Sequence, residues 1–263
     1  MKNEIRIFFT ALMFYTRIPC PKWVDHSAEY INKSTRYFPL IGWIVGGIAS
    51  LFLYGGDFLF GIPIAILLSM IASVLTTGAF HEDGFADMCD GFGGGWTKEQ
   101  ILDIMKDSRL GTYGAIGLLL ILLLKFFLTL QLIDLFETEW LLIVLIIISS
   151  HSLSRFVAST FIVSHDYVQD ADNSKVKPVA KSLKAKDVII GAVWGLIPFA
   201  GLIYFLEIWY VVFAIVPLFI GKAYLGRFFK KWIGGYTGDC LGATQQVTEV
   251  LFLASILGLW TFI

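Results

Sequence analysis

Residues 112–134 read TYGAIGLLLILLLKFFLTLQLID, and Lys125 is the only charged side chain before Asp134 closes the stretch. A helix needs about 20 mostly apolar residues to cross the hydrocarbon core of a bilayer. This stretch and residues 139–159 both reach that length and are the clearest such segments of the chain. They predict that the chain crosses a membrane as helices.

The composition of the whole chain agrees with this interpretation. Of 263 residues, 57% are hydrophobic and 16% are charged, whereas an average soluble domain is about 25% charged. We therefore predict an all-α, polytopic transmembrane helical bundle that forms a single integral membrane domain over residues 1–263. About seven spans are expected, at roughly 37–55, 60–80, 112–134, 139–159, 188–206, 208–225 and 245–263. The net charge of −1 gives no reason to expect a nucleic-acid partner.

The Lys and Arg residues predict the orientation, because cytoplasmic connections carry an excess of them. With the N-terminus in the cytoplasm, 19 of the 20 lie inside or at inner helix ends, and only Lys125 falls within a span. The long connections at 81–111, 160–187 and 226–244 then face the cytoplasm, and the short acidic ones at 56–59, 135–138 and 207 lie outside. We expect a multi-pass protein of the cell inner membrane whose active site faces the cytoplasm. The three cysteines then lie on the reducing side as free thiols.

The first 36 residues are predicted to form an N-terminal interfacial segment. A helix over residues 4–17 would place Ile5, Phe8, Phe9, Leu12 and Met13 on one face. Such a helix can lie in the membrane interface. An ordinary buried helix explains the same pattern equally well.

The acidic segment HEDGFADMCDGFGGG, residues 81–95, is the first candidate for chemistry. In a helix, Asp83, Asp87 and Asp90 would share one face, with Glu82 beside them. Carboxylates this close repel one another, and a divalent cation relieves that repulsion. Mg²⁺ prefers carboxylate oxygens together with substrate phosphates. A solvated acidic loop is the alternative, but the segment directly follows an apolar helix, where charge is costly.

Other polar residues fall on the same predicted side. Thr97 and Gln100 match a capping box at the start of a short helix. Lys106 and Arg109, at the end of this helix and just after it, could bind phosphates or form surface ion pairs. Arg155 could reach a phosphate or extend to the membrane surface. The lysines near residue 175 could attract anionic lipid or an anionic substrate. Glu249, in or beside a span, is a functional hypothesis by default.

Six stretches together resemble one known family. They are FYTRIP (14–19), TGAFHEDGFADMCDGFGGG (77–95), MKDSRLGTYGAIG (105–117), SRFVA (154–158), SKVKP (174–178) and YTGDCLGA (236–243). In this order they resemble the cobalamin synthases, or adenosylcobinamide-GDP ribazoletransferases. The resemblance implies a Mg²⁺-dependent transfer of cobinamide phosphate from adenosylcobinamide-GDP to α-ribazole or its 5′-phosphate. The products would be adenosylcobalamin, or its 5′-phosphate, and GMP.

The resemblance also implies residue roles and partners. Glu82, Asp83, Asp87 and Asp90 would be catalytic and hold Mg²⁺, with Asp83 or a neighbouring carboxylate as the base. The substrate-binding residues would be His81, Lys106, Asp107, Ser108, Arg109, Arg155, Lys175, Lys177 and Asp239. The expected partners are the two substrates and the lipid bilayer, with a homo-oligomer or a complex with other cobalamin-assembly enzymes as further candidates.

Two other functions compete with this interpretation. A CDP-alcohol phosphatidyltransferase expects aspartates that continue at four-residue spacing, but Asp90 follows Asp87 by only three positions. A cation-coupled membrane transporter predicts charges near mid-membrane and an internal repeat. The acidic cluster lies at the predicted inner boundary instead, and no repeat is visible in the sequence.

Overall fold

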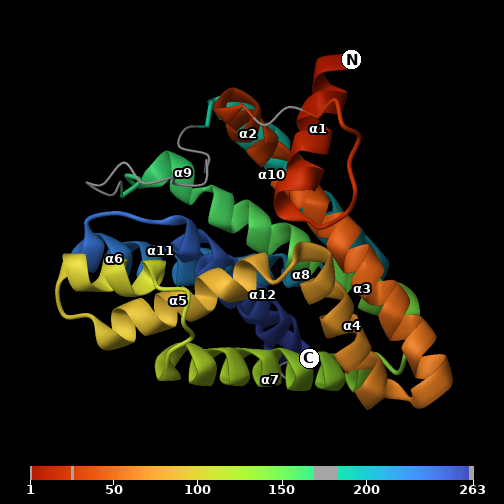
Figure 1. Cartoon of the computed structure of the whole chain (residues 1–263). Helices are drawn as coiled ribbons and strands as arrows, with labels where there is room; N and C mark the ends of the chain where they lie inside the picture. Colours follow the sequence, from red (N-terminus) through yellow and green to blue (C-terminus); the bar gives the residue numbers. More distant parts are fainter. Residues whose placement is uncertain (1, 25–26, 169–182, 261–263) are drawn as a thin grey trace.

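The computed structural model describes residues 2–24, 27–168 and 183–260, and within them it confirms the all-α prediction (Figure 1). Its helices are α1 (Lys2–Tyr15), α2 (Ala28–Ser34), η1 (Thr35–Tyr37), α3 (Phe38–Phe60), α4 (Ile62–Thr77), α5 (Phe80–Gly94), α6 (Lys98–Lys106), α7 (Thr112–Leu135), α8 (Trp140–Ser159), α9 (Phe161–Ser164), α10 (Ala185–Leu206), η2 (Trp209–Ile215), α11 (Val216–Ile233) and α12 (Gly238–Trp260).

The described helices confirm a polytopic membrane bundle. Six of them are long and apolar enough to cross a membrane, and the bent pair α4 and α5 makes a seventh if it is counted as one span. Lipid-facing surface explains why α7 leaves large apolar side chains such as Leu119, Leu120 and Phe127 exposed. In contrast, α8 and α12 are mostly buried and form the centre of the bundle.

The predicted span at 60–80 is broken rather than continuous. Helix α4 ends at Thr77, and α5 continues at an angle of 89°. Gly78 and Ala79 adopt left-handed φ values of 69° and 59°, which no α-helix can continue through. The backbone N–H of Arg17 donates to the carbonyl of Thr76, and its side chain lies where a Cβ on Gly78 would be. Sequence periodicity could not show this break, because both flanking segments are helical.

Helix α5 carries the acidic segment into the bundle between α7 and α12. Small residues permit this close packing. A Cβ on Gly84 would come within 3.0 Å of the Cα of Asp239, and one on Gly242 within 3.2 Å of the carbonyl oxygen of His81. The segment is therefore a helix held against α12. The final span also begins earlier than the predicted residue 245, because α12 already starts at Gly238.

Helix α1 packs on the outside of this bundle through part of the predicted face, because Leu12 is buried and Phe8 and Phe9 are partly buried against the same cluster. Ala11 and Tyr15 are also buried against the start of α3, while Ile5 is 48% exposed. The helix also ends at Tyr15, two residues earlier than expected, and Thr16 caps it by donating to the carbonyl of Leu12. This packing places the FYTRIP stretch beside the start of α5.

Candidate active site

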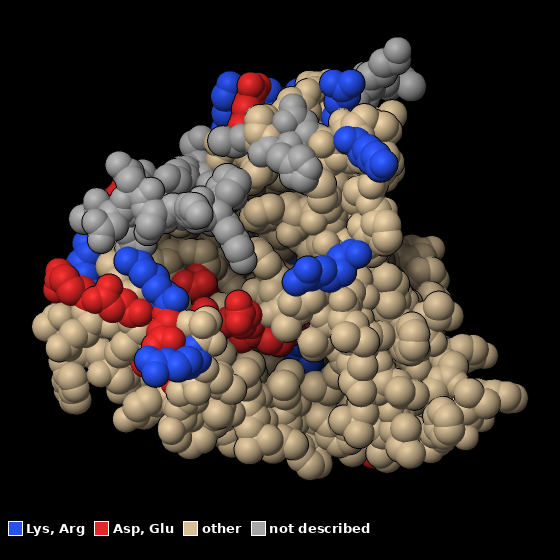
Figure 2. Space-filling model, in the orientation of Figure 1, with Lys and Arg blue, Asp and Glu red and all other residues tan. Residues whose placement is uncertain are grey.

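Three carboxylates from α5 and α12 face one hollow of the molecule. Asp83 and Asp87 are one helical turn apart on α5; Asp83 is exposed and Asp87 is half-buried. Asp239, in the first turn of α12, is half-buried opposite Gly84, and its charge acts on Asp87 together with that of Asp83. Figure 2 shows acidic side chains gathered in a hollow of this face, with Lys and Arg around it. We call Asp83, Asp87 and Asp239 the carboxylate triad.

Asp90 lies on the same helix but has a different environment. Its side chain is buried, and its two oxygens accept hydrogen bonds from the backbone N–H groups of Gly111 and Gly114, at 2.7 and 2.8 Å. These N–H groups belong to the first turn of α7, where no intrahelical acceptor exists and the helix dipole favours negative charge. Asp90 therefore anchors the N-terminus of α7 to α5.

Glu82 points away from the triad into the interior of the bundle. One of its oxygens accepts a hydrogen bond from the side-chain amide of Gln246 at 3.0 Å, and within the described residues the other oxygen is buried without a partner. The predicted set of four metal-binding carboxylates is thus divided in space. Two members face the hollow, one caps α7 and one faces the interior.

A network of buried charges continues from Glu82 into the bundle. The ammonium of Lys125 lies 2.7 Å from the carboxylate of Glu249, and both side chains are buried. Glu249 also accepts a hydrogen bond from Gln245 and lies 3.5 Å from the His151 ring. Charges at this depth are expensive unless they are paired. The sequence identified Lys125 and Glu249 as unusual, but residues 124 positions apart gave no signal of pairing.

Arg155 and His81 belong to the wall between this network and the aromatic residues of α1 and α3. Arg155 is 1% exposed, donates to the carbonyl of His151 at 2.8 Å and lies over the Phe38 ring. The prediction that it could extend to the membrane surface is wrong. A phosphate could reach it only by entering the buried pocket that Arg155 lines together with His81 and Glu82.

Comparison with known proteins identifies the family. The family described as Cobalamin-5-phosphate synthase (CobS) matches residues 7–257, nearly the whole chain. The chain belongs to this family. Proteins called adenosylcobinamide-GDP ribazoletransferase are similar to it: that of Shewanella frigidimarina (strain NCIMB 400) is 45% identical over 97% of this chain and 95% of its own length. The protein of that name from Leptospira interrogans is 42% identical over 100% of this chain and 99% of its own length. The one from Vibrio cholerae is 41% identical over 98% of this chain and 95% of its own length. No solved structure matches the chain.

In this cobalamin-5-phosphate synthase family member, the connection between α6 and α7 lies at the surface. The guanidinium of Arg109 donates to both carboxylate oxygens of Asp107, with a shortest distance of 2.6 Å, and these bonds hold the pKa of Asp107 below its ordinary value. Lys106 lies 3.9 Å from Asp103, and Ser108 is exposed. The contacts follow the surface ion-pair alternative, and binding of a phosphate here stays a prediction. Lys175 and Lys177 lie outside the described residues.

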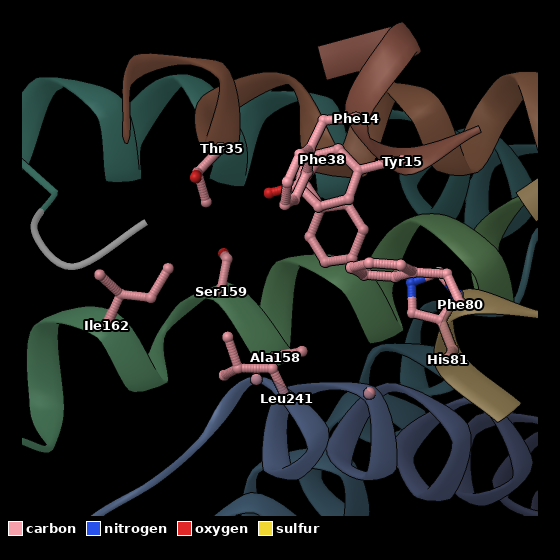
Figure 3. A pocket seen from close by; sticks show the side chains of 12 residues that line it. Phe14, Tyr15, Thr35, Phe38, Phe80, His81, Ala158, Ser159, Ile162 and Leu241 are labelled. Carbon is pink, nitrogen blue, oxygen red and sulfur yellow. The ribbon is translucent and has the colours of Figure 1, made fainter. Parts of the chain in front are cut away.

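A separate pocket opens beside the triad, and sequence reasoning did not find it. We call it the aromatic pocket; Phe14, Tyr15, Thr35, Phe38, Phe80, His81, Ala158, Ser159, Ile162, Gly238, Leu241 and Gly242 line it. In Figure 3 the rings of Tyr15 and Phe38 lie on one side, Ala158 and Ser159 of α8 on the other, and Phe80 and His81 at one end. Its residues come from five separate regions of the chain, so no sequence window could show it.

The residues of this synthase fit a magnesium ion that is shared with a substrate. Among the described residues, no three His, Cys, Asp or Glu side chains lie close enough to hold a metal by themselves. Mg²⁺, however, is often bound by one or two carboxylates plus substrate phosphates. Asp83 and Asp87 offer that donor set, because neither uses its oxygens in the way Asp90 does.

Proposed function

We propose that the chain is an adenosylcobinamide-GDP ribazoletransferase, a transferase of cobalamin nucleotide-loop assembly. Family membership over residues 7–257 and the relatives of that name, which align over nearly their full lengths, support the activity. The observation that carries it in the structure is the carboxylate triad, held by α5 and α12 at one end of a membrane bundle. The group of charged side chains at this end of the bundle suits a diphosphate substrate bound with a divalent cation.

The proposed reaction is a phosphoryl transfer. A ribose hydroxyl of α-ribazole, or of its 5′-phosphate, attacks the phosphorus atom that carries cobinamide. A new P–O bond forms, the P–O bond to GMP breaks, and GMP leaves with the electron pair of that bond. The hydroxyl proton passes to a carboxylate. Such reactions are catalysed mainly by positioning and by stabilising charge.

We assign the proton acceptor to Asp83, the exposed member of the triad. Asp87, which is half-buried, would hold the cation together with Asp83, and Asp239 would add its negative charge beside them. When bound, Mg²⁺ neutralises charge on the diphosphate oxygens and so favours departure of GMP. Asp90 and Glu82 support the site by holding α5 against α7 and α12.

The orientation is also a proposal. Chain alternation puts the N-termini of α3, α7, α10 and α12 and the C-termini of α8 and α11 at one end of the bundle. Contacts agree, since Arg36 before α3 pairs with Asp187 at the start of α10, at 3.1 Å. The Lys and Arg excess at this end supports a cytoplasmic active site in a cell inner membrane. Water-soluble nucleotide substrates would then reach the triad from the cytoplasm.

The test is GMP release by purified full-length protein in detergent with Mg²⁺. We expect release from adenosylcobinamide-GDP only when α-ribazole or its phosphate is present. Asp83→Asn should abolish release, while the matched control Asp103→Asn, at an exposed position on α6, should keep it. Unchanged turnover by Asp83→Asn would remove the assignment of the base. Release of CMP from a CDP-alcohol would favour a phospholipid-synthesising enzyme instead.

A further inference from the structure

The aromatic pocket has no part in the chemistry described so far, although it adjoins the carboxylate triad. Gly238 and Gly242 of its lining flank Asp239 on α12, and His81 directly precedes Glu82 and Asp83 on α5. The close contact of Gly242 with His81 joins the two regions. A ligand in the pocket would therefore contact residues that are close neighbours of Asp83 and Asp239 in the sequence.

The walls of the pocket suit a flat apolar ring. Tyr15 and Phe38 are stacked with ring centroids 4.2 Å apart, and Phe38 is in turn stacked on His81 at 5.6 Å. Phe80 meets Tyr15 edge to face. The cavity between these rings and α8 has a volume of about 50 Å³ and opens to the surface. Such arrangements of aromatic rings are typical of sites that bind planar groups.

One polar atom in this lining lacks a partner. The Nε2 atom of His81 is buried, and no described residue hydrogen-bonds to it. A buried polar atom without a partner is costly, so a ligand that supplies one gains affinity. An imidazole N–H can donate to a ring nitrogen. The pocket thus offers mostly apolar walls, one unpartnered ring nitrogen, and the hydroxyls of Thr35 and Ser159, which already donate to backbone carbonyls.

From this juxtaposition we propose that the aromatic pocket binds the base of the acceptor nucleoside, α-ribazole. This inference rests on the proposed function. The base is a benzimidazole with two methyl groups and one free ring nitrogen, which matches the mostly apolar walls and the unpartnered ring nitrogen of His81. Guanine fits less well, because it would bury more donors and acceptors than this lining can satisfy. The corrin ring, a large macrocycle bearing amides, does not match a small cavity between aromatic rings and α8.

The placement also has a chemical consequence. With its base in the pocket, the ribose of α-ribazole extends toward α5 and the start of α12. Its hydroxyls then lie on the side of Asp83 and Asp239. The donor diphosphate occupies the hollow in front of the triad, so the two substrates approach each other from different sides of α5.

Steady-state kinetics of GMP release by the full-length protein tests this proposal. Leu241→Trp replaces an aliphatic side chain of the lining by an indole ring and so fills part of the pocket. Ile220→Trp, at a lipid-facing position of α11, is the matched control. We expect Leu241→Trp to raise the KM for α-ribazole by about tenfold, with the KM for adenosylcobinamide-GDP unchanged. His81→Phe keeps the stack on Phe38 but removes the nitrogen, and it should give the same selective rise.

A competition experiment uses the wild-type protein, so its result does not depend on whether a substituted protein folds. Free dimethylbenzimidazole should inhibit competitively against α-ribazole and not against adenosylcobinamide-GDP. A selective rise in the KM for adenosylcobinamide-GDP, or competition against it, would assign the pocket to the donor and overturn the proposal. So would an unchanged KM for both substrates in both variants. These results would contradict the pocket assignment but not the proposed function. A wild-type protein that releases no GMP would contradict both the pocket assignment and the proposed function.

Discussion

Asp90 offers the sharpest distinction between an anchoring and a catalytic carboxylate. Its two oxygens accept from Gly111 and Gly114 at the start of α7. In Asp90→Asn, the amide oxygen can still accept one of these bonds, but its NH₂ group faces the other N–H. One backbone donor is then buried without an acceptor, and the negative charge beside the helix N-terminus is lost.

The expected cost follows from these two losses. A hydrogen bond to a charged group contributes about 1.5–3 kcal/mol to stability, and a charge at a helix N-terminus adds about 0.3–1 kcal/mol. Asp90→Asn should therefore lower the free energy of unfolding by about 2–4 kcal/mol. Asp83 is exposed, so Asp83→Asn should change the stability by less than about 0.5 kcal/mol while it abolishes GMP release.

Unfolding of both variants in the same detergent, followed by circular dichroism with denaturant, measures the difference. GMP release under native conditions supplies the second reading. The reasoning fails if Asp90→Asn is as stable as the wild type but inactive, since Asp90 would then act as a catalytic ligand. It fails equally if Asp83→Asn destabilises the protein as much as Asp90→Asn does.

Three further results are expected. Lys125→Met leaves the buried carboxylate of Glu249 without its lysine partner and should lower the stability by about 3–5 kcal/mol. Adding Glu249→Gln removes the buried charge and should largely restore the stability, as measured by thermal unfolding. Equal stability of the single and double variants would contradict this pairing. Chelation of divalent cations should stop GMP release, and added Mg²⁺ should restore it; full turnover in excess chelator would count against the metal assignment. With the native cysteines replaced by serine, a membrane-impermeant maleimide should label Glu137→Cys but not Asp103→Cys on intact cells, and the reverse pattern would invert the topology.

The sequence predicts the membrane spans well because each one is a local property. Lipid selects for about 20 consecutive apolar residues, and such runs are visible without any tertiary information. The helical face of Asp83 and Asp87 is local in the same sense. The capping box of Thr97 and Gln100 is confirmed, because both of its hydrogen bonds join residues three apart.

What could not be predicted depends on contacts between distant segments. The four acidic residues of α5 look equivalent in sequence, yet Asp90 meets α7 and Glu82 meets Gln246 of α12. The break after Thr77 depends partly on Arg17, which is 60 positions earlier in the sequence. The aromatic pocket likewise exists only after α1, α3, α5, α8 and α12 have packed together.

The break between α4 and α5 bears on how the protein is made. Helix α4, with 16 residues, is shorter than a bilayer is thick, and α5 is too acidic to enter lipid unaided. Helices α4 and α5 can reach their final position in the bilayer only when α7 and α12 supply hydrogen-bond partners for the polar groups of α5. Because α12 emerges from the ribosome long after α5, maturation of the catalytic centre is postponed until late in biogenesis.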